Sequence, residues 1–141
     1  MPVLRVEMIV EAEATRPHVH VELLQRKARI LQDAEEAADE MVARKNRITA
    51  VFATADIMGM GLMRGLQKHG LRVPEDISVI GFDDVYLARM SNPPMTTVHQ
   101  DIRMKGRLAV QYIMESLDGD ETKKENILPI SIVERESVRK V

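Results

Sequence analysis

Two apolar segments of strand length, separated by one amphipathic segment, dominate the pattern of hydrophobic and polar positions. Residues 48–54 and 77–82 are rich in β-branched and other apolar residues, which is typical of strands buried on both faces of a parallel sheet. The residues between them, 56–69, have the spacing of a helix, and Gly70 is placed to end it. Strand, helix and strand over this length predict a βαβ unit.

The flanking segments predict further helices and strands of the same α/β class. An Ala- and Glu-rich helix is expected at 33–45, with an inward stripe of Ala34, Ala37, Ala38 and Met41. Asp101 is placed to cap a second helix that runs to about Leu117. Short strands are expected at 18–23, 96–100 and 128–135, the last of them at a sheet edge, and residues 85–95 predict a loop.

Composition restricts the kinds of protein that this pattern can describe. The 141 residues suffice for one domain, and 45% hydrophobic with 30% charged residues is ordinary for a soluble globular protein. The net charge of −2, without a basic patch, disfavours direct binding of nucleic acid. The absence of Cys excludes disulfides and Cys-based zinc sites. No signal peptide or apolar run of about 18 residues is visible, so we expect a cytoplasmic protein without membrane contact.

Polar side chains follow both strands of the predicted βαβ unit. Asp83 and Asp84 end the second strand, and ligands of open α/β sheets bind just beyond the carboxyl ends of the strands. Thr54 and Asp56 end the first strand, where one of them could cap the next helix or both could line a cleft with Asp83. A competing interpretation is a metal- or phosphate-handling enzyme, because three carboxylates, Asp56, Asp83 and Asp84, could hold a cation such as Mg²⁺.

Glycine and histidine residues offer two further interpretations. Gly59, Gly61 and Gly65 could suggest a dinucleotide-binding turn, but they fall inside the predicted helix rather than at the strand end. Their position favours close packing of the helix against the sheet. His18 and His20 would share one face of a strand, but two ligands without a third favour surface histidines over a metal site.

Several blocks of residues occur in an order and spacing that carry a family resemblance. The blocks are 49–56, 70–84 (which ends in Gly81-Phe82-Asp83-Asp84), 93–100, 106–107 and 128–129. Over residues 48–141 the chain closely resembles the C-terminal part of the lactose-repressor (LacI/GalR) family, whereas residues 1–47 match the family pattern poorly. The resemblance implies one truncated effector-binding domain over residues 1–141, without a DNA-binding headpiece. It also implies a parallel-sheet, periplasmic-binding-protein-like (type I) C-terminal subdomain with flanking helices.

The resemblance implies a function and a set of site residues as well. In the family, a small effector, usually a sugar or a nucleobase, binds between two subdomains and controls DNA binding by the headpiece. The first Asp of the Gly-Phe-Asp-Asp block contacts the effector, which implies that role for Asp83. The Gln that closes the Thr-Thr-x-x-Gln block is often a pocket residue, here Gln100. Where the family has an effector-binding Asn, this chain has Ala55, which removes one polar contact. Asp84 is expected to hold the following loop.

The predicted function is therefore effector sensing in a transcription regulator, and not catalysis. The predicted ligand-binding residues are Asp83, Gln100, Asp56 and Thr54, with no catalytic residue, metal or cofactor. Operator DNA would be reached only through a missing headpiece. Besides the enzyme described above, a fragment of a solute-binding protein is the alternative.

The helix after Asp101 carries an apolar stripe that needs a partner. The stripe consists of Ile102, Ala109, Val110, Ile113 and Leu117. The family resemblance implies that this helix packs in the other subdomain. Because exposed apolar patches drive association, we expect a homodimer or an element-swapped oligomer through residues 101–117.

Overall fold

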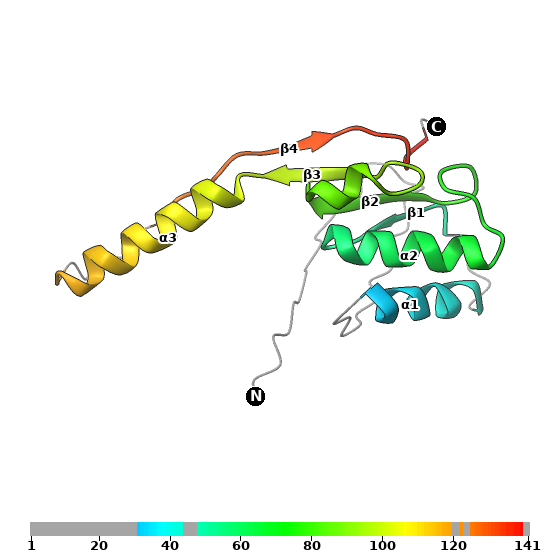
Figure 1. Cartoon of the computed structure of the whole chain (residues 1–141), viewed down its shortest axis with the longest axis horizontal. Helices are drawn as coiled ribbons and strands as arrows, with labels where there is room; N and C mark the ends of the chain where they lie inside the picture. Colours follow the sequence, from blue (N-terminus) through cyan, green and yellow to red (C-terminus); the bar gives the residue numbers. More distant parts are fainter. Residues whose placement is uncertain (1–30, 44–47, 120–121, 123–124, 140–141) are drawn as a thin grey trace, which may run out of the picture.

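Four strands form one sheet in the order β1-β2-β3-β4 in the computed structural model, which describes residues 31–43, 48–119, 122 and 125–139 (Figure 1). The strands are β1 (Ala50–Phe52), β2 (Ser78–Asp83), β3 (Thr96–Gln100) and β4 (Ile130–Val133). The helices are α1 (Leu31–Ala43), α2 (Asp56–Lys68), the 3₁₀ helix η1 (Tyr86–Arg89) and α3 (Ile102–Leu117). β1, β2 and β3 are parallel and β4 is antiparallel to β3, which confirms the α/β fold and its parallel-dominated sheet.

Parallel pairing places the carboxyl ends of β1, β2 and β3 at one edge of the sheet. In the register of the sheet, Phe52 lies beside Ile80 and Asp83 lies beside His99. The start of α2, the turn after β2 and the start of α3 therefore gather at this edge. It is the edge where the sequence predicts a ligand.

The helices on the sheet lie in successive layers. α2 packs on β2, and α1 packs on α2 rather than on the sheet (Figure 1). Gly59 faces the sheet, where an added Cβ would lie 2.6 Å from the Met95 Sδ, so the predicted close packing is confirmed there. Gly65 instead faces α1, where an added Cβ would lie 2.6 Å from the Ala38 Cβ and 2.7 Å from the Glu35 carbonyl oxygen.

Aliphatic and methionine side chains fill the core between α2 and the sheet. Met63, Leu66, Val79 and Met95 are fully buried. The predicted inward stripe of α1 is also confirmed, because Ala34, Ala38 and Met41 are buried and Ala37 is half-buried. Methionine thus fills the space that aromatic residues fill in many cores.

Two local predictions are wrong. The first strand is not buried, since Ala50 is exposed and Phe52 is 37% exposed. The reason is that β1 lies at the sheet edge and pairs only with β2 among the described residues. The segment 85–95 is not only loop, because η1 forms there and buries Ala88. The strand predicted at 18–23 and residues 44–45 of the first helix lie outside the described residues.

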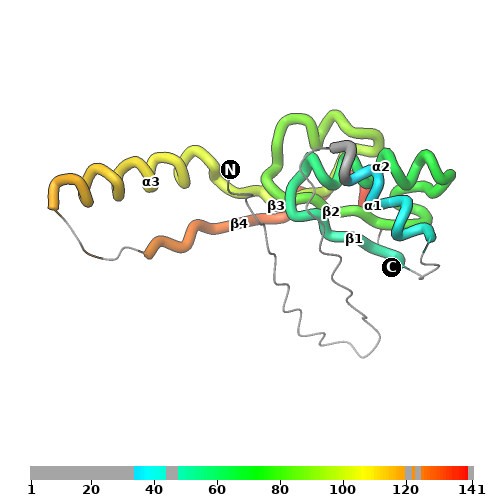
Figure 2. Tube along the Cα trace, turned by 90° about the horizontal axis from the view of Figure 1, so that it is seen from below, coloured from blue at the N-terminus to red at the C-terminus, as the bar shows by residue number. Residues whose placement is uncertain are grey.

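α3 and residues 125–129, which lead into β4, form an arm that extends beyond the sheet, whereas β4 itself pairs with β3 (Figures 1 and 2). No residue of α3 is buried, and the stripe residues Val110, Ile113 and Leu117 are 62%, 60% and 75% exposed. Ile130 and Ile132 of β4 are similarly exposed. The predicted apolar stripe therefore has no partner within the described part of the chain. None of the described helices has the length and apolarity that crossing a membrane requires.

The two mid-helix glycines Gly65 and Gly106 give a test of the helix packing. We predict that Gly65→Ala lowers the free energy of unfolding by about 1–2 kcal/mol, since overpacking outweighs the gain in helix propensity. The neighbouring Glu35 carbonyl is backbone and can move only with α1. Gly106→Ala is the matched control, because no atom lies within 4 Å of its added Cβ. Urea denaturation followed by circular dichroism measures both, and equal stability of the two variants would contradict the packing.

Candidate functional site

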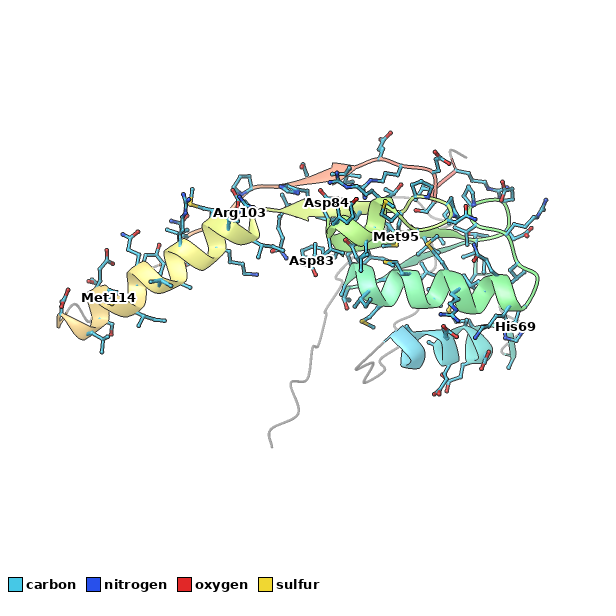
Figure 3. All side chains as sticks on the ribbon, viewed as in Figure 1. His69, Asp83, Asp84, Met95, Arg103 and Met114 are labelled. Carbon is cyan, nitrogen blue, oxygen red and sulfur yellow. The ribbon has the colours of Figure 1, made fainter. Side chains whose placement is uncertain are left out.

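The turn after β2 has an unusual backbone. Asp83 and Asp84 have φ angles of +110° and +52°, a left-handed region that side chains other than glycine seldom adopt. Such conformations persist only where surrounding contacts enforce them, and they cluster at functional sites. Figure 3 shows both carboxylates at the end of the sheet from which α3 departs, whereas His69 lies at the far end of α2.

Asp83 and Gln100 come together at this edge. The Gln100 Nε2 donates a hydrogen bond to the Asp83 Oδ1, and the Gln100 Oε1 accepts one from the Lys105 Nζ at 3.3 Å. Asp83 is half-buried, and its Oδ2 has no hydrogen-bond partner within the described residues. A half-buried carboxylate with one unengaged oxygen can accept hydroxyl or amine donors from a ligand.

Asp56 lies beneath this surface, 1% exposed. Its Oδ1 accepts a hydrogen bond from the Thr97 hydroxyl at 2.5 Å, and its Oδ2 accepts one from the Val85 N–H at 2.8 Å. Burial raises the pKa of Asp56, although both hydrogen bonds act in the opposite direction. Gly81 makes room for this carboxylate, because an added Cβ would collide with the Asp56 Oδ1 and lie 2.7 Å from the Met95 Cε.

The alternative that Thr54 or Asp56 caps α2 is wrong. The residue at the N-cap is Ala55, and no side chain caps the helix. Thr54 is half-buried and directs its hydroxyl to the Met58 Sδ at 3.7 Å. Asp56 is instead the first helical residue, and it ties the helix to β3 and to the turn after β2.

Asp84 is bound on both sides. The Arg135 Nη2 lies 2.5 Å from its Oδ1, and the His99 Nδ1 lies 3.0 Å from its Oδ2. Burial acts to raise the pKa of Asp84, but the hydrogen bonds from Arg135 and His99 lower it overall. The predicted structural role is thus supported, with a difference in partners. Asp84 holds β3 and the segment after β4, and not the loop that follows it.

Sequence reasoning missed the residues that hold Asp83 and Asp84 in place, directly or through a neighbour. Thr97 and His99 are on β3, Lys105 is on α3, and Arg135 comes more than fifty positions after Asp83. Thr97 lies beside Gly81 in the parallel register, which only the structure shows. The others come from chain crossings that no local pattern reveals.

The geometry of the described residues disfavours a cation site at the turn. Within the described residues, no three His, Cys, Asp or Glu side chains are arranged to hold a metal ion. A shallow depression exists at the opposite end of the sheet, where β2 and β3 begin, so it is separate from Asp83 and Gln100. Its walls are Gln67, Gly70, Leu71, Arg72, Val73, Glu75, Asn92 and Pro93.

Comparison with known proteins relates the chain to a family and to several regulators. A family model described as a periplasmic binding protein-like domain matches residues 6–138. The HTH-type transcriptional repressor PurR of Vibrio atlanticus is 45% identical over 104 residues, which are 73% of this chain and 31% of that repressor. The chain thus spans about a third of the length of this curated relative, which is a repressor and not an enzyme.

Solved structures give the same relationship in three dimensions. The lac repressor dimer bound to operator and the anti-inducer ONPF is 32% identical, with a TM-score of 0.70 over 77% of this chain and 38% of that chain. The transcriptional regulator CelR in complex with cellobiose is 34% identical, with a TM-score of 0.70 over 77% of this chain and 33% of that one.

Substitutions of Asp56 test the buried hydrogen bonds beneath the turn. We predict that Asp56→Ala lowers the free energy of unfolding by about 2–4 kcal/mol, because two buried donors lose their acceptor. Asp56→Asn should cost far less, since an amide oxygen can accept from Val85 while the amide nitrogen donates to Thr97. Urea denaturation measures both, and an equal loss would contradict the assignment.

The wild type and Asp56→Asn together test whether the pKa of Asp56 is raised in the folded state. A pKa raised in the folded state contributes stability below the unfolded value, 3.8, and that contribution is lost as the pH rises through the folded value. The free energy of unfolding of the wild type relative to Asp56→Asn should therefore fall as the pH rises from 3 to 7.

Proposed function

This chain belongs to the family of periplasmic binding protein-like domains, as part of a LacI/GalR-type regulator, and on this premise we propose that it forms one wall of an effector-binding cleft. The observation that carries the proposal is the Asp83 carboxylate, which the left-handed turn presents beside Gln100 with one oxygen unengaged. An ionised carboxylate can accept two charge-assisted hydrogen bonds, which suits a polyhydroxylated or amino-substituted effector.

The proposed effector contacts divide into two kinds. Asp83 and Gln100 are partly exposed at the strand ends, so they are the direct contacts. Thr54 is half-buried on the same edge and is a secondary contact. Asp56 was predicted as a contact, but both its oxygens are already engaged. We therefore propose that it supports the site from beneath, by binding the Thr97 hydroxyl and the Val85 N–H. Ala55 removes a polar contact, which favours an effector recognised mainly through Asp83.

The regulatory mechanism that we propose is a shift between two closure states. α3 leaves the site and residues 125–129 lead back to it, and together they form the arm that extends away from the sheet (Figure 2). An effector held by both Asp83 and a second wall beyond this arm would favour one relative orientation of the two walls. Operator contact is proposed to belong to a headpiece outside residues 1–141 and the site of action to be the cytoplasm, as in a soluble regulator.

The alternative enzyme is disfavoured by the engagement of its three carboxylates. Asp56 is bound by Thr97 and Val85, and Asp84 is bound by Arg135 and His99. Only Asp83 has an oxygen without a described partner. A single carboxylate falls short of the oxygen ligands that a hard cation requires.

We further propose that the chain self-associates through α3. Four residues of its apolar stripe are more than half exposed: Ile102, Val110, Ile113 and Leu117. The lac repressor in the compared structure is a dimer.

Ligand titration of this chain tests the effector site. Cellobiose and adenine serve as probes of the two effector classes, with backbone amide shifts recorded by NMR. We predict weak binding of at least one probe that perturbs the residues around Asp83 and Gln100. Asp83→Ala should weaken it about 10- to 100-fold, since hydrogen bonds to a charged group are lost. Asp118→Ala, which removes an exposed carboxylate at the end of α3, is the control. Absence of any perturbation, or an equal effect of both variants, would count against the site.

Sedimentation velocity tests the association through α3. We predict a dimer or larger species at micromolar concentration, because the exposed stripe gains from burial. Ile113→Glu should shift the population to monomer, since a carboxylate in the stripe would be desolvated without a partner. Gln111→Glu introduces the same carboxylate on the opposite side of the helix and should leave the dimer intact. A wild-type monomer at this concentration would refute the proposal.

A further inference from the structure

The turn at Asp83 and Asp84 needs an external support. Two consecutive left-handed residues without glycine are each unfavourable by about 1–2 kcal/mol, so the isolated turn would relax to another conformation. The Val85 N–H is fixed by Asp56, and the Asp84 N–H approaches the Thr97 hydroxyl oxygen at 3.4 Å. These contacts hold the backbone, but they leave the Asp84 side chain to be placed by other residues.

Arg135 supplies this support from a distant part of the sequence. Its guanidinium donates from Nη1 to the Met95 carbonyl oxygen at 2.8 Å and from Nη2 to the Asp84 Oδ1 at 2.5 Å. Its own N–H donates to the Thr96 hydroxyl at 2.9 Å. The side chains of Arg135 and Asp84 are only 13% and 12% exposed, so this charge pair is shielded from water on both sides.

The segment that carries Arg135 is itself fixed. Ser137 is fully buried, and its hydroxyl donates to the Val79 carbonyl and accepts from the Thr96 N–H at 2.8 Å. The Val79 N–H donates to the Ser137 carbonyl oxygen at 2.9 Å. Arg135 therefore reaches Asp84 from a rigid base that bridges β2 and β3.

We infer that Arg135 is a positioning residue of the effector site. Its ion pair with Asp84 holds the turn, and the turn directs the Asp83 carboxylate toward Gln100 and a ligand. The ion pair acts through the backbone, because a turn that leaves the left-handed region rotates the Asp83 side chain away from Gln100. Because Arg135 lies two residues after the end of β4, the same contact joins the effector site to the strand that leads back from the arm. The effector role of Asp83 rests on the proposed function, whereas the ion pair between Arg135 and Asp84 is a property of the free chain.

Side-chain NMR of the free chain tests this inference. In the wild type, one Gln100 side-chain amide proton should be shifted downfield and exchange slowly with water, because the amide is hydrogen-bonded to Asp83. We expect Arg135→Met to abolish this hydrogen-bond signal. Arg72→Met is the matched control, since it removes an arginine ion pair with Asp76 elsewhere on the chain, and it should leave the signal unchanged. A folded Arg135→Met chain with an unchanged Gln100 signal would overturn the inference.

Two further variants separate positioning from general loss of stability. In the double variant Asp84→Gly/Arg135→Met, glycine adopts the left-handed conformation without support from Arg135, and part of the Gln100 hydrogen-bond signal should return. Absence of any return would contradict positioning through the backbone. If Arg135→Met does not fold, Arg135→Lys decides, because lysine keeps the charge but lacks the planar guanidinium whose two nitrogens bind Asp84 and the Met95 carbonyl separately. It should weaken the Gln100 hydrogen-bond signal, and an unchanged signal would refute the inference. No effector is needed, so failure of probe binding would count against the proposed function alone.

Discussion

The buried carboxylate of Asp56 is the constraint on which the rest of the described structure depends. Removal of a carboxylate from water is unfavourable unless its oxygens are hydrogen-bonded. Here Thr97 and the Val85 N–H meet that requirement, and they come from β3 and from the turn after β2. One side chain at the start of α2 thus joins three segments. Gly81 is part of the same solution, because any larger residue would occupy the space of the carboxylate.

The candidate site is built on these hydrogen bonds of Asp56. The Val85 N–H anchors the turn, and Arg135 and His99 hold the carboxylate of Asp84. Asp83 is then left as the acidic side chain with an unengaged oxygen at the strand edge. The two neighbouring aspartates therefore have different roles, one turned toward a ligand and one used to maintain the turn.

The arm formed by α3 and residues 125–129 explains why this site is one wall and not a closed pocket. α3 makes no extensive contact with any other described element, and its apolar stripe is exposed. An apolar surface of this kind is stable only when another surface covers it. The shallow depression lined by Gln67 and Arg72 lies at the other end of the sheet and shares no residue with the turn.

The sequence by itself determined the βαβ unit, the cap of α3 by Asp101 and the edge position of the last strand, because periodicity, capping and turn residues are local signals. It also located Asp83 and Gln100 through a resemblance, and the structure brings these two residues into contact. It misjudged the burial of β1, since an apolar run looks alike in the centre and at the edge of a sheet. Only the tertiary structure placed Asp56 beneath the site and Arg135 beside Asp84. These roles depend on which strands become neighbours, and residues more than fifty positions apart leave no common pattern in the sequence.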